Sequence, residues 1–157
     1  IQLARNLRID LAKAFTPITK LVETILVVVS NPALPVSSLN ELVSYARRNP
    51  GKLFYSTSSI GGVHHLSGEE IGILTGINWL HVPYKGGTQA LLDTMTGQVH
   101  VNFAAFSTTV PHLKTQKLRI LGVNNAQRYH VIPDVPTLSE QLPGYQPPPA
   151  WLRPSIP

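Results

Sequence analysis

The sequence His81-Val82-Pro83-Tyr84-Lys85-Gly86-Gly87-Thr88 joins a predicted strand to a predicted helix. The apolar run 77–82 is typical of a buried strand, and the apolar residues within 90–95 recur at helical spacing. Two glycines at such a junction let the backbone approach a ligand and leave the first helical N–H groups without partners. Because this end of a helix carries partial positive charge, we predict that it can bind a carboxylate or a phosphate. Taken alone, the same pattern also fits an ordinary turn with a glycine before the helix.

Small and hydroxyl residues follow two further predicted strands. The strand at 53–56 runs into a serine- and glycine-rich loop, and the strand at 99–103 precedes Ser107-Thr108-Thr109, which we expect to cap a short helix. If neighbouring strands carry these junctions, the three loops meet in one crevice beyond the carboxyl ends of the strands. We therefore predict a site in which backbone amides and hydroxyl groups hold an anion. The candidate ligand-binding residues are Ser58, Ser59, Gly61, Gly62, Tyr84, Lys85, Gly86, Gly87, Thr88, Ala104, Ser107 and Thr108.

Strand and helix patterns alternate at short intervals along the chain. Apolar runs at 24–30 and 118–123 predict two more strands, the first of them covered on both faces. Ser37 or Ser38 is expected to cap a helix that ends near Arg48. The pattern Thr137-Leu138-Ser139-Glu140 predicts a capping box and one last short helix. This alternation predicts an α/β fold with an open, mainly parallel sheet flanked by helices.

Composition narrows the class of protein. The 157 residues are enough for one core-bearing domain, and 43% hydrophobic with 13% charged residues indicates a folded chain. No apolar run is long enough to span a membrane, and the start does not resemble a signal peptide. The absence of cysteine excludes disulfides and thiol catalysis. The basic residues behind the net charge of +5 are scattered, with only Arg47-Arg48 adjacent, so we expect no nucleic-acid binding and a surface that attracts anions.

Ser58 and Ser59 raise the alternative of a hydrolase. A nucleophile elbow needs glycine two residues before and two residues after the serine, and Thr57 occupies the first of these places for Ser59. His65 could act as a general base only beside a nucleophile and an orienting acid, and otherwise it is a packed or capping histidine. His64 and His65 are adjacent and no HExxH motif occurs, so we expect no metal site, no cofactor and no catalytic residues.

Five stretches of the sequence occur together, in this order, in one known family. Through them the chain resembles the periplasmic solute-binding proteins of tripartite tricarboxylate transporters, the Bug or TctC family, from about Phe15 to Tyr145. The resemblance implies a type II periplasmic-binding-protein-like lobe that binds a small carboxylate and delivers it to the membrane permease subunits of the transporter. It also implies a periplasmic location and no enzymatic activity. The stretches are Phe15-Thr16-Pro17-Ile18 ahead of a Val-rich strand and Asn31-Pro32, Asn49-Pro50-Gly51-Lys52-Leu53, Gly61 with His65-Leu66, His81 to Gly87, and Pro133-Asp134-Val135-Pro136-Thr137 with Glu140.

The resemblance also implies a division of the chain, because family members are longer and this sequence matches their middle. Residues 1–23 are expected to be a remnant of the first lobe and a crossing segment, residues 24–123 the second ligand-binding lobe, and residues 124–157 a return segment with a proline-rich tail. Many relatives carry Asp-Asn where this chain has Ala104-Ala105, which favours a plain carboxylate over an amino acid. Ile60 replaces a polar residue, so that loop would bind through its backbone and its serines.

The sequence also fits two other classes of protein. An effector-binding domain of a transcription regulator would share the general architecture, and a small α/β hydrolase is the other alternative. A lobe without its companion would expose apolar surface, so we expect the chain to self-associate.

Overall fold

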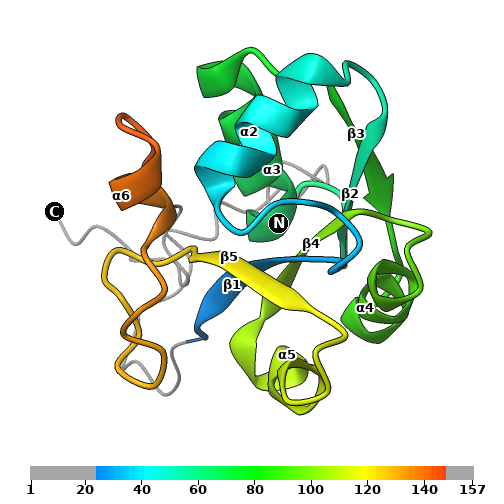
Figure 1. The fold of residues 1–157 in the computed structure, drawn as a ribbon, viewed down its shortest axis with the longest axis vertical. Coiled ribbons are helices and arrows are strands. Elements are labelled where there is room, and N and C mark those ends of the chain that lie inside the picture. Colours follow the sequence, from blue (N-terminus) through cyan, green and yellow to red (C-terminus); the bar gives the residue numbers. More distant parts are fainter. Residues whose placement is uncertain (1–23, 148–157) are drawn as a thin grey trace, which may run out of the picture.

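Helices and strands alternate along residues 24–147, the part of the chain that the computed structural model describes (Figure 1). The remnant of the first lobe and the crossing segment, predicted for residues 1–23, lie outside these residues. Within residues 24–147 no helix is both long and apolar enough to cross a membrane. The elements are β1 (Leu26–Ser30), α2 (Leu39–Arg48), β2 (Leu53–Thr57), α3 (Val63–Thr75), β3 (Trp79–Pro83), α4 (Gly87–Met95), β4 (Val101–Ala105), α5 (Phe106–Leu113), β5 (Arg119–Val123) and α6 (Leu138–Gln141).

The described strands form one sheet in the order β3-β2-β4-β1-β5. Strand β2 pairs in parallel with both β3 and β4, whereas β1 pairs antiparallel with both β4 and β5. Four strands therefore point one way and β1 points the other way, which confirms the prediction of a mainly parallel sheet and adds one reversed strand. Because of this reversal, β1 begins at the edge where the other four strands end.

Strand β1 is buried on both faces, as the run of β-branched residues predicts. All five of its residues are buried, and its pairing with β5 shifts register between Val28 and Val29. Val28 faces one hydrophobic cluster, and Val27 and Val29 face another on the opposite side of the sheet. The strand thus contributes side chains to both cores while its backbone joins two neighbours.

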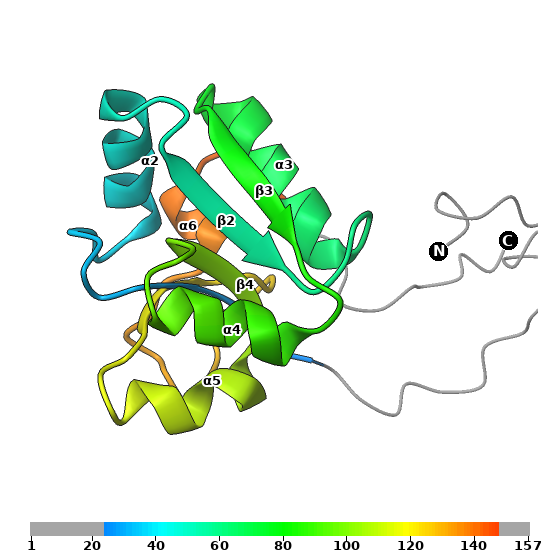
Figure 2. The same cartoon turned by 90° about the vertical axis from the view of Figure 1, so that its right-hand side faces the viewer.

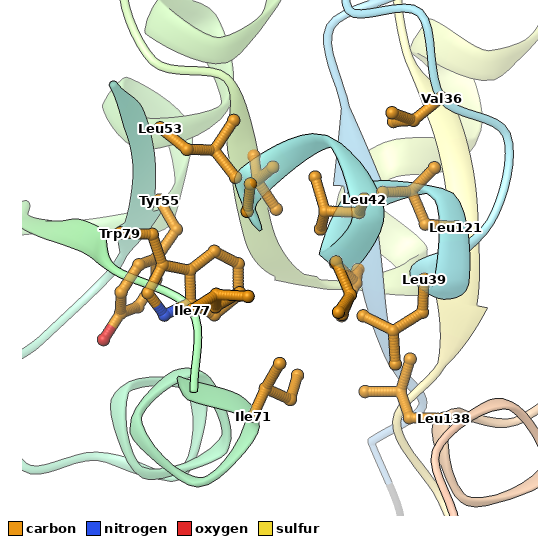
Figure 3. Close-up of a cluster of buried hydrophobic side chains, with 14 of the residues drawn as sticks. Val36, Leu39, Leu42, Leu53, Tyr55, Ile71, Ile77, Trp79, Leu121 and Leu138 are labelled. Atoms are coloured by element: carbon orange, nitrogen blue, oxygen red, sulfur yellow. The ribbon is translucent and has the colours of Figure 1, made fainter. Parts of the chain in front are cut away.

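Helices cover both faces of the sheet, as Figure 2 shows. On one face, α2, α3 and α6 enclose the larger cluster, in which Tyr55 and Trp79 lie beside Ile71 of α3 (Figure 3). Their rings tilt at 33° with centroids 4.5 Å apart. On the other face, α4 and α5 enclose a smaller cluster that contains Leu91. Burial of these side chains is the main stabilising contribution to the fold.

Two helices begin with the side-chain caps that the sequence predicts. Ser38 accepts a hydrogen bond from the Glu41 amide at the start of α2. Thr137 and Glu140 form a complete capping box at the start of α6. The buried Gln141 side chain then links three elements, since its Oε1 accepts from the Leu39 amide and its Nε2 donates to the Leu121 carbonyl, at 2.8 and 2.9 Å. Helix α6 is thereby fixed against α2 and β5.

The buried side of α3 is not formed by its leucines. Leu66 and Leu74 are 49% and 44% exposed. The inward-facing residues of α3 include Gly68 and Ile71. Gly68 lies against the Tyr55 ring so closely that a Cβ added to it would be 2.4 Å from Cε2 of Tyr55. The helix therefore needs a residue without a side chain where it crosses the aromatic ring. The strand predicted to be buried at 77–82 is instead β3, an edge strand of the described sheet, and its Leu80 is 46% exposed.

We expect Gly68→Ala to lower the free energy of unfolding by about 1–3 kcal/mol, because the added methyl group overlaps a fully buried ring. Urea unfolding of the full chain measures this change. Gly87→Ala is the matched control, since a Cβ at Gly87 meets nothing within 4 Å. Equal stability of the two variants would show that α3 does not pack as closely on Tyr55 as described.

Candidate functional site

Three strand-to-helix junctions lie at one edge of the sheet. Strands β3, β2 and β4 are neighbours and parallel, so their carboxyl ends share an edge, and each is followed directly in sequence by α4, α3 or α5 (Figure 2). The condition for the predicted crevice, that neighbouring strands carry the three junctions, is thus met. Ligands of open α/β sheets bind at this kind of edge.

The three helices that follow these strands lack the side-chain caps of α2 and α6. Their N-cap residues are Gly62, Gly86 and Ala105, and none of them makes a side-chain cap hydrogen bond. In contrast, α2 and α6, which do not follow these three strands, are capped by Ser38 and Thr137. Uncapped helix starts direct N–H donors and partial positive charge toward whatever lies beyond the edge. All three junctions therefore suit an anion.

The Ser58–Gly62 loop after β2 is tightly folded. Gly61 has φ of +73°, in the left-handed region that favours glycine, and a Cβ at Gly62 would lie 2.5 Å from Ser59 Oγ. Ser59 and Gly61 are exposed, whereas Ser58 and Gly62 are half-buried. The Ile60 side chain is 68% exposed. The loop thus offers backbone and hydroxyl groups to solvent at the edge of the sheet.

The junction after β3 is the most open of the three. Lys85, Gly86, Gly87 and Thr88 are all exposed. The half-buried Tyr84 was considered for its hydroxyl, but that hydroxyl donates to Asp93 Oδ2 at 2.7 Å. Burial, together with the Asp93 carboxylate, raises the pKa of Tyr84 to about 12. Tyr84 therefore joins the junction to α4 and does not point a free hydroxyl at a ligand.

The junction after β4 differs from its prediction in two ways. The strand continues to Ala105, which pairs with Leu26, and α5 begins at Phe106, so Ser107 and Thr108 lie in the first helical turn instead of capping it. Both are exposed, and Thr108 Oγ1 donates to the Ala105 carbonyl at 2.8 Å. The first amide of α5 is taken by the Ile25 carbonyl, at 2.8 Å.

Ala104 has a different environment from the other candidates. Its side chain is 7% exposed and belongs to the smaller hydrophobic cluster, together with Val27 and Val123. A direct role for this side chain in ligand binding is therefore not supported, and Ala105 is the residue of this strand that reaches the edge. The other candidates remain predictions as ligand contacts.

A cluster of aromatic and polar side chains beneath the loop was missed by sequence reasoning. The rings of His65 and His81 stack with centroids 4.1 Å apart, and the Tyr55 ring stacks on His81 at 4.9 Å. Glu69 accepts a hydrogen bond from the Tyr55 hydroxyl and lies 3.7 Å from His65 Nε2. The members come from β2, β3 and α3, and no local sequence signal unites them.

The cluster contains a threonine–histidine pair that bears on the hydrolase alternative. Thr57 Oγ1 lies 2.7 Å from His81 Nε2, a distance that suits a nucleophile and its base. However, Thr57 is fully buried and its hydroxyl donates to the Ser59 carbonyl at 2.9 Å, so a substrate carbonyl has no path to it. His65 Nδ1 accepts a hydrogen bond from the Gly61 amide. His65 is therefore the capping histidine that the sequence allows as the alternative to a general base. Among the residues described, no three His, Asp or Glu side chains are grouped as a metal ion would require.

The mixed, mostly parallel sheet flanked by helices is the fold of periplasmic binding proteins of the TctC and Bug type. The family model "Tripartite tricarboxylate transporter family receptor" (TctC) matches residues 2–152. The chain therefore belongs to the TctC family.

Individual relatives are similar over most of this chain but over less than half of their own length. A UPF0065 protein of Bordetella pertussis is 30% identical over 145 residues, which are 92% of this chain and 44% of that protein. Among solved structures, R. palustris Rpa4515 with adipate is 35% identical with a TM-score of 0.76, over 79% of this chain and 42% of that one. MatC from Rhodopseudomonas palustris with bound malate is 28% identical with a TM-score of 0.71, over the same shares of 79% and 42%.

We expect acidification below about pH 6.5 to destabilise the fold. Burial lowers the pKa of His64, His81 and His100 from the ordinary value of 6.5, so the unfolded chain binds more protons than the folded chain as pH falls past this value. The stabilising contribution is complete above pH 6.5 and is lost as pH falls through the lowered pKa values. Urea midpoints measured from pH 8 to pH 5 would contradict this expectation if they stayed constant. Glu140, whose pKa is lowered to about 2 by Arg128 and Thr137, acts in a separate window below pH 4.5.

Proposed function

We propose that this chain is a carboxylate-binding lobe of a solute receptor, and that the ligand's negative charge is received by helix N–H groups at the edge of the sheet. The observation that carries the proposal is the meeting of three uncapped helix starts on adjacent strands. Each start contributes partial positive charge without the desolvation cost of burying a full cation. The residues proposed to contact the ligand are Ser58, Ser59, Gly61, Gly62, Lys85, Gly86, Gly87, Thr88, Ser107 and Thr108.

The identities of the relatives support the choice of ligand class. Two solved structures of similar sequence hold adipate and malate, both of which are small dicarboxylates. The formal net charge of +5 would draw such anions toward the protein. The lack of an acidic side chain at Ala104 and Ala105 removes a partner for a ligand amino group. We therefore favour a plain carboxylate over an amino acid.

The biological role that we propose follows the family. The lobe would work in the periplasm with a companion lobe, close on the ligand, and present it to the membrane permease subunits of a tripartite tricarboxylate transporter. The chain spans less than half of the length of the curated relatives that it matches. The proposed role is therefore that of a two-lobed protein of their length. Binding without turnover is the proposed activity, since the two histidines beneath the loop are engaged by Thr57 and by the Gly61 amide.

A charge placed at the start of α4 provides a direct test. We expect Thr88→Glu to weaken adipate binding about tenfold or more, since a carboxylate among the N–H donors repels the ligand and takes its place. Isothermal titration calorimetry of the full chain with adipate measures the dissociation constant. Thr88 is exposed, so the substitution does not disturb the core.

Thr96→Glu is the matched control, because it adds the same charge at the exposed far end of the same helix. Its affinity for adipate should stay within about twofold of the original protein. Equal weakening by both variants would mean that net charge alone governs binding. No effect of Thr88→Glu would remove α4 from the site.

We also propose that the chain self-associates. Large apolar side chains lie exposed on neighbouring elements, with Leu66 at 49%, Ile73 at 80%, Leu80 at 46% and Leu92 at 44%. Exposed apolar surface favours association in water. Sedimentation velocity at increasing concentration should show species larger than the 17.2 kDa monomer, and Ile73→Lys should reduce them. A monomer at all concentrations would contradict the proposal.

A further inference from the structure

Two imidazole rings hold the backbone of the Ser58–Gly62 loop from below. The Gly61 amide donates to His65 Nδ1 at 3.1 Å. His81 Nε2 lies 2.7 Å from Thr57 Oγ1, whose hydroxyl donates to the Ser59 carbonyl at 2.9 Å. Both sides of the loop are thus connected, directly or through one hydroxyl, to a histidine.

The hydrogen-bond partners fix where each neutral ring carries its proton. His65 Nδ1 accepts from a backbone N–H, so the proton of neutral His65 is on Nε2, the atom that faces Glu69 at 3.7 Å. Thr57 uses its only proton on the Ser59 carbonyl, so it must accept from His81 and the proton of neutral His81 is on Nε2. The two assignments are compatible with each other and leave every named bond made.

Protonation of His65 disturbs this arrangement, whereas a protonated His81 would still donate from Nε2 to Thr57. A proton added to His65 Nδ1 would point at the Gly61 N–H, so that two donors face each other and the bond is lost. The two rings stack with centroids 4.1 Å apart, so a charge on one disfavours a charge on the other. The titratable groups around the pair are Tyr55 from β2, with its ring on His81, and Glu69 from α3. His64, also on α3, has its Nε2 buried without a partner among the described residues.

We propose that His65 and His81 are positioning residues of the anion site, and that His65 holds the Ser58–Gly62 loop in its binding conformation only while its ring is neutral. Mild acid then releases the loop and weakens binding of the anion. Simple charge attraction predicts the opposite pH dependence of affinity, since a protonated imidazole near the edge would strengthen anion binding. The direction of the pH effect therefore separates a positioning role from a purely electrostatic one. The part of this inference that concerns the ligand rests on the proposed function.

The loop contact can be measured without any ligand. In the 15N-labelled chain, the Gly61 amide resonance and the ring nitrogens of His65 should respond together as the pH is lowered. His65→Leu should shift the Gly61 resonance at all pH values. His65→Asn should keep a shift like that of the original protein and lose the pH dependence, because its Oδ1 takes the place of Nδ1 and does not titrate. A Gly61 resonance that ignores both pH and the variants would overturn the inference.

Adipate titrations between pH 8 and pH 6, where the probe's carboxyl groups remain ionised, test the effect on binding. We expect the dissociation constant to rise about threefold to tenfold toward pH 6 in the original protein, as expected for loss of one net hydrogen bond. It should stay nearly constant in the double variant His65→Asn/His81→Gln, which keeps both polar atoms without a titrating ring. Tighter binding at pH 6 would overturn the inference in favour of charge attraction.

His100→Asn is the matched control, because His100 Nδ1 also accepts from a backbone amide, that of Phe54, but at the opposite end of β2. This variant should retain the pH dependence of the original protein, and its loss here would contradict a role specific to the loop. If adipate fails to bind at any pH, the proposed function is wrong, while the Gly61 resonance still decides whether the histidines hold the loop.

Discussion

The pairing of the reversed strand β1 between β4 and β5 is the constraint on which the architecture depends. Its backbone hydrogen bonds join the parallel β3-β2-β4 unit to β5, and its alternating valines fill the cores on both faces. Because β1 begins where the other strands end, Leu26 lies beside Ala105, and the Ile25 carbonyl occupies the first amide of α5. Asn125 completes this edge by accepting a hydrogen bond from the Leu26 amide at 2.8 Å. The segments flanking β1 and β5 are thereby tied together at the proposed binding edge.

The proposed site shows how a sheet can bind an anion with few charged groups. The proposed donors are main-chain amides, whose directions are fixed by helices that pack against the core, so little would have to be ordered when a ligand arrives. The glycines at two of the junctions are part of this design, because a side-chain cap would compete for the same amides. The side chains beneath the Ser58–Gly62 loop have a supporting role: they connect its backbone to the buried Tyr55 and hence to the packing of α3.

The sequence predicted most elements of the fold, and its failures have a common cause. Local signals were sufficient for α2, α6 and the five strands, where periodicity or caps agree with the final packing. The helix cap predicted at Ser107-Thr108-Thr109 is wrong, because pairing of Ala105 with Leu26 extends β4 and supplies the helix start with a tertiary partner. The reversal of β1 and the exposure of Leu66 depend on contacts between distant segments. For the same reason the stacked histidines could not be foreseen, although the sequence did locate all three junctions.

The position of β1 also has a consequence for how the chain acquires its structure. β1 is the first described strand to leave the ribosome, yet its partners are residues 101–105 and 119–123, which emerge last among the strands. The β2-α3-β3 unit can form early from local contacts, whereas the sheet is completed only by a late, long-range step of high contact order. Until then the sequence Leu26-Val27-Val28-Val29 is an unpaired β-branched segment of the kind that aggregates. The strand that unites the finished lobe is thus the one that most needs protection during synthesis.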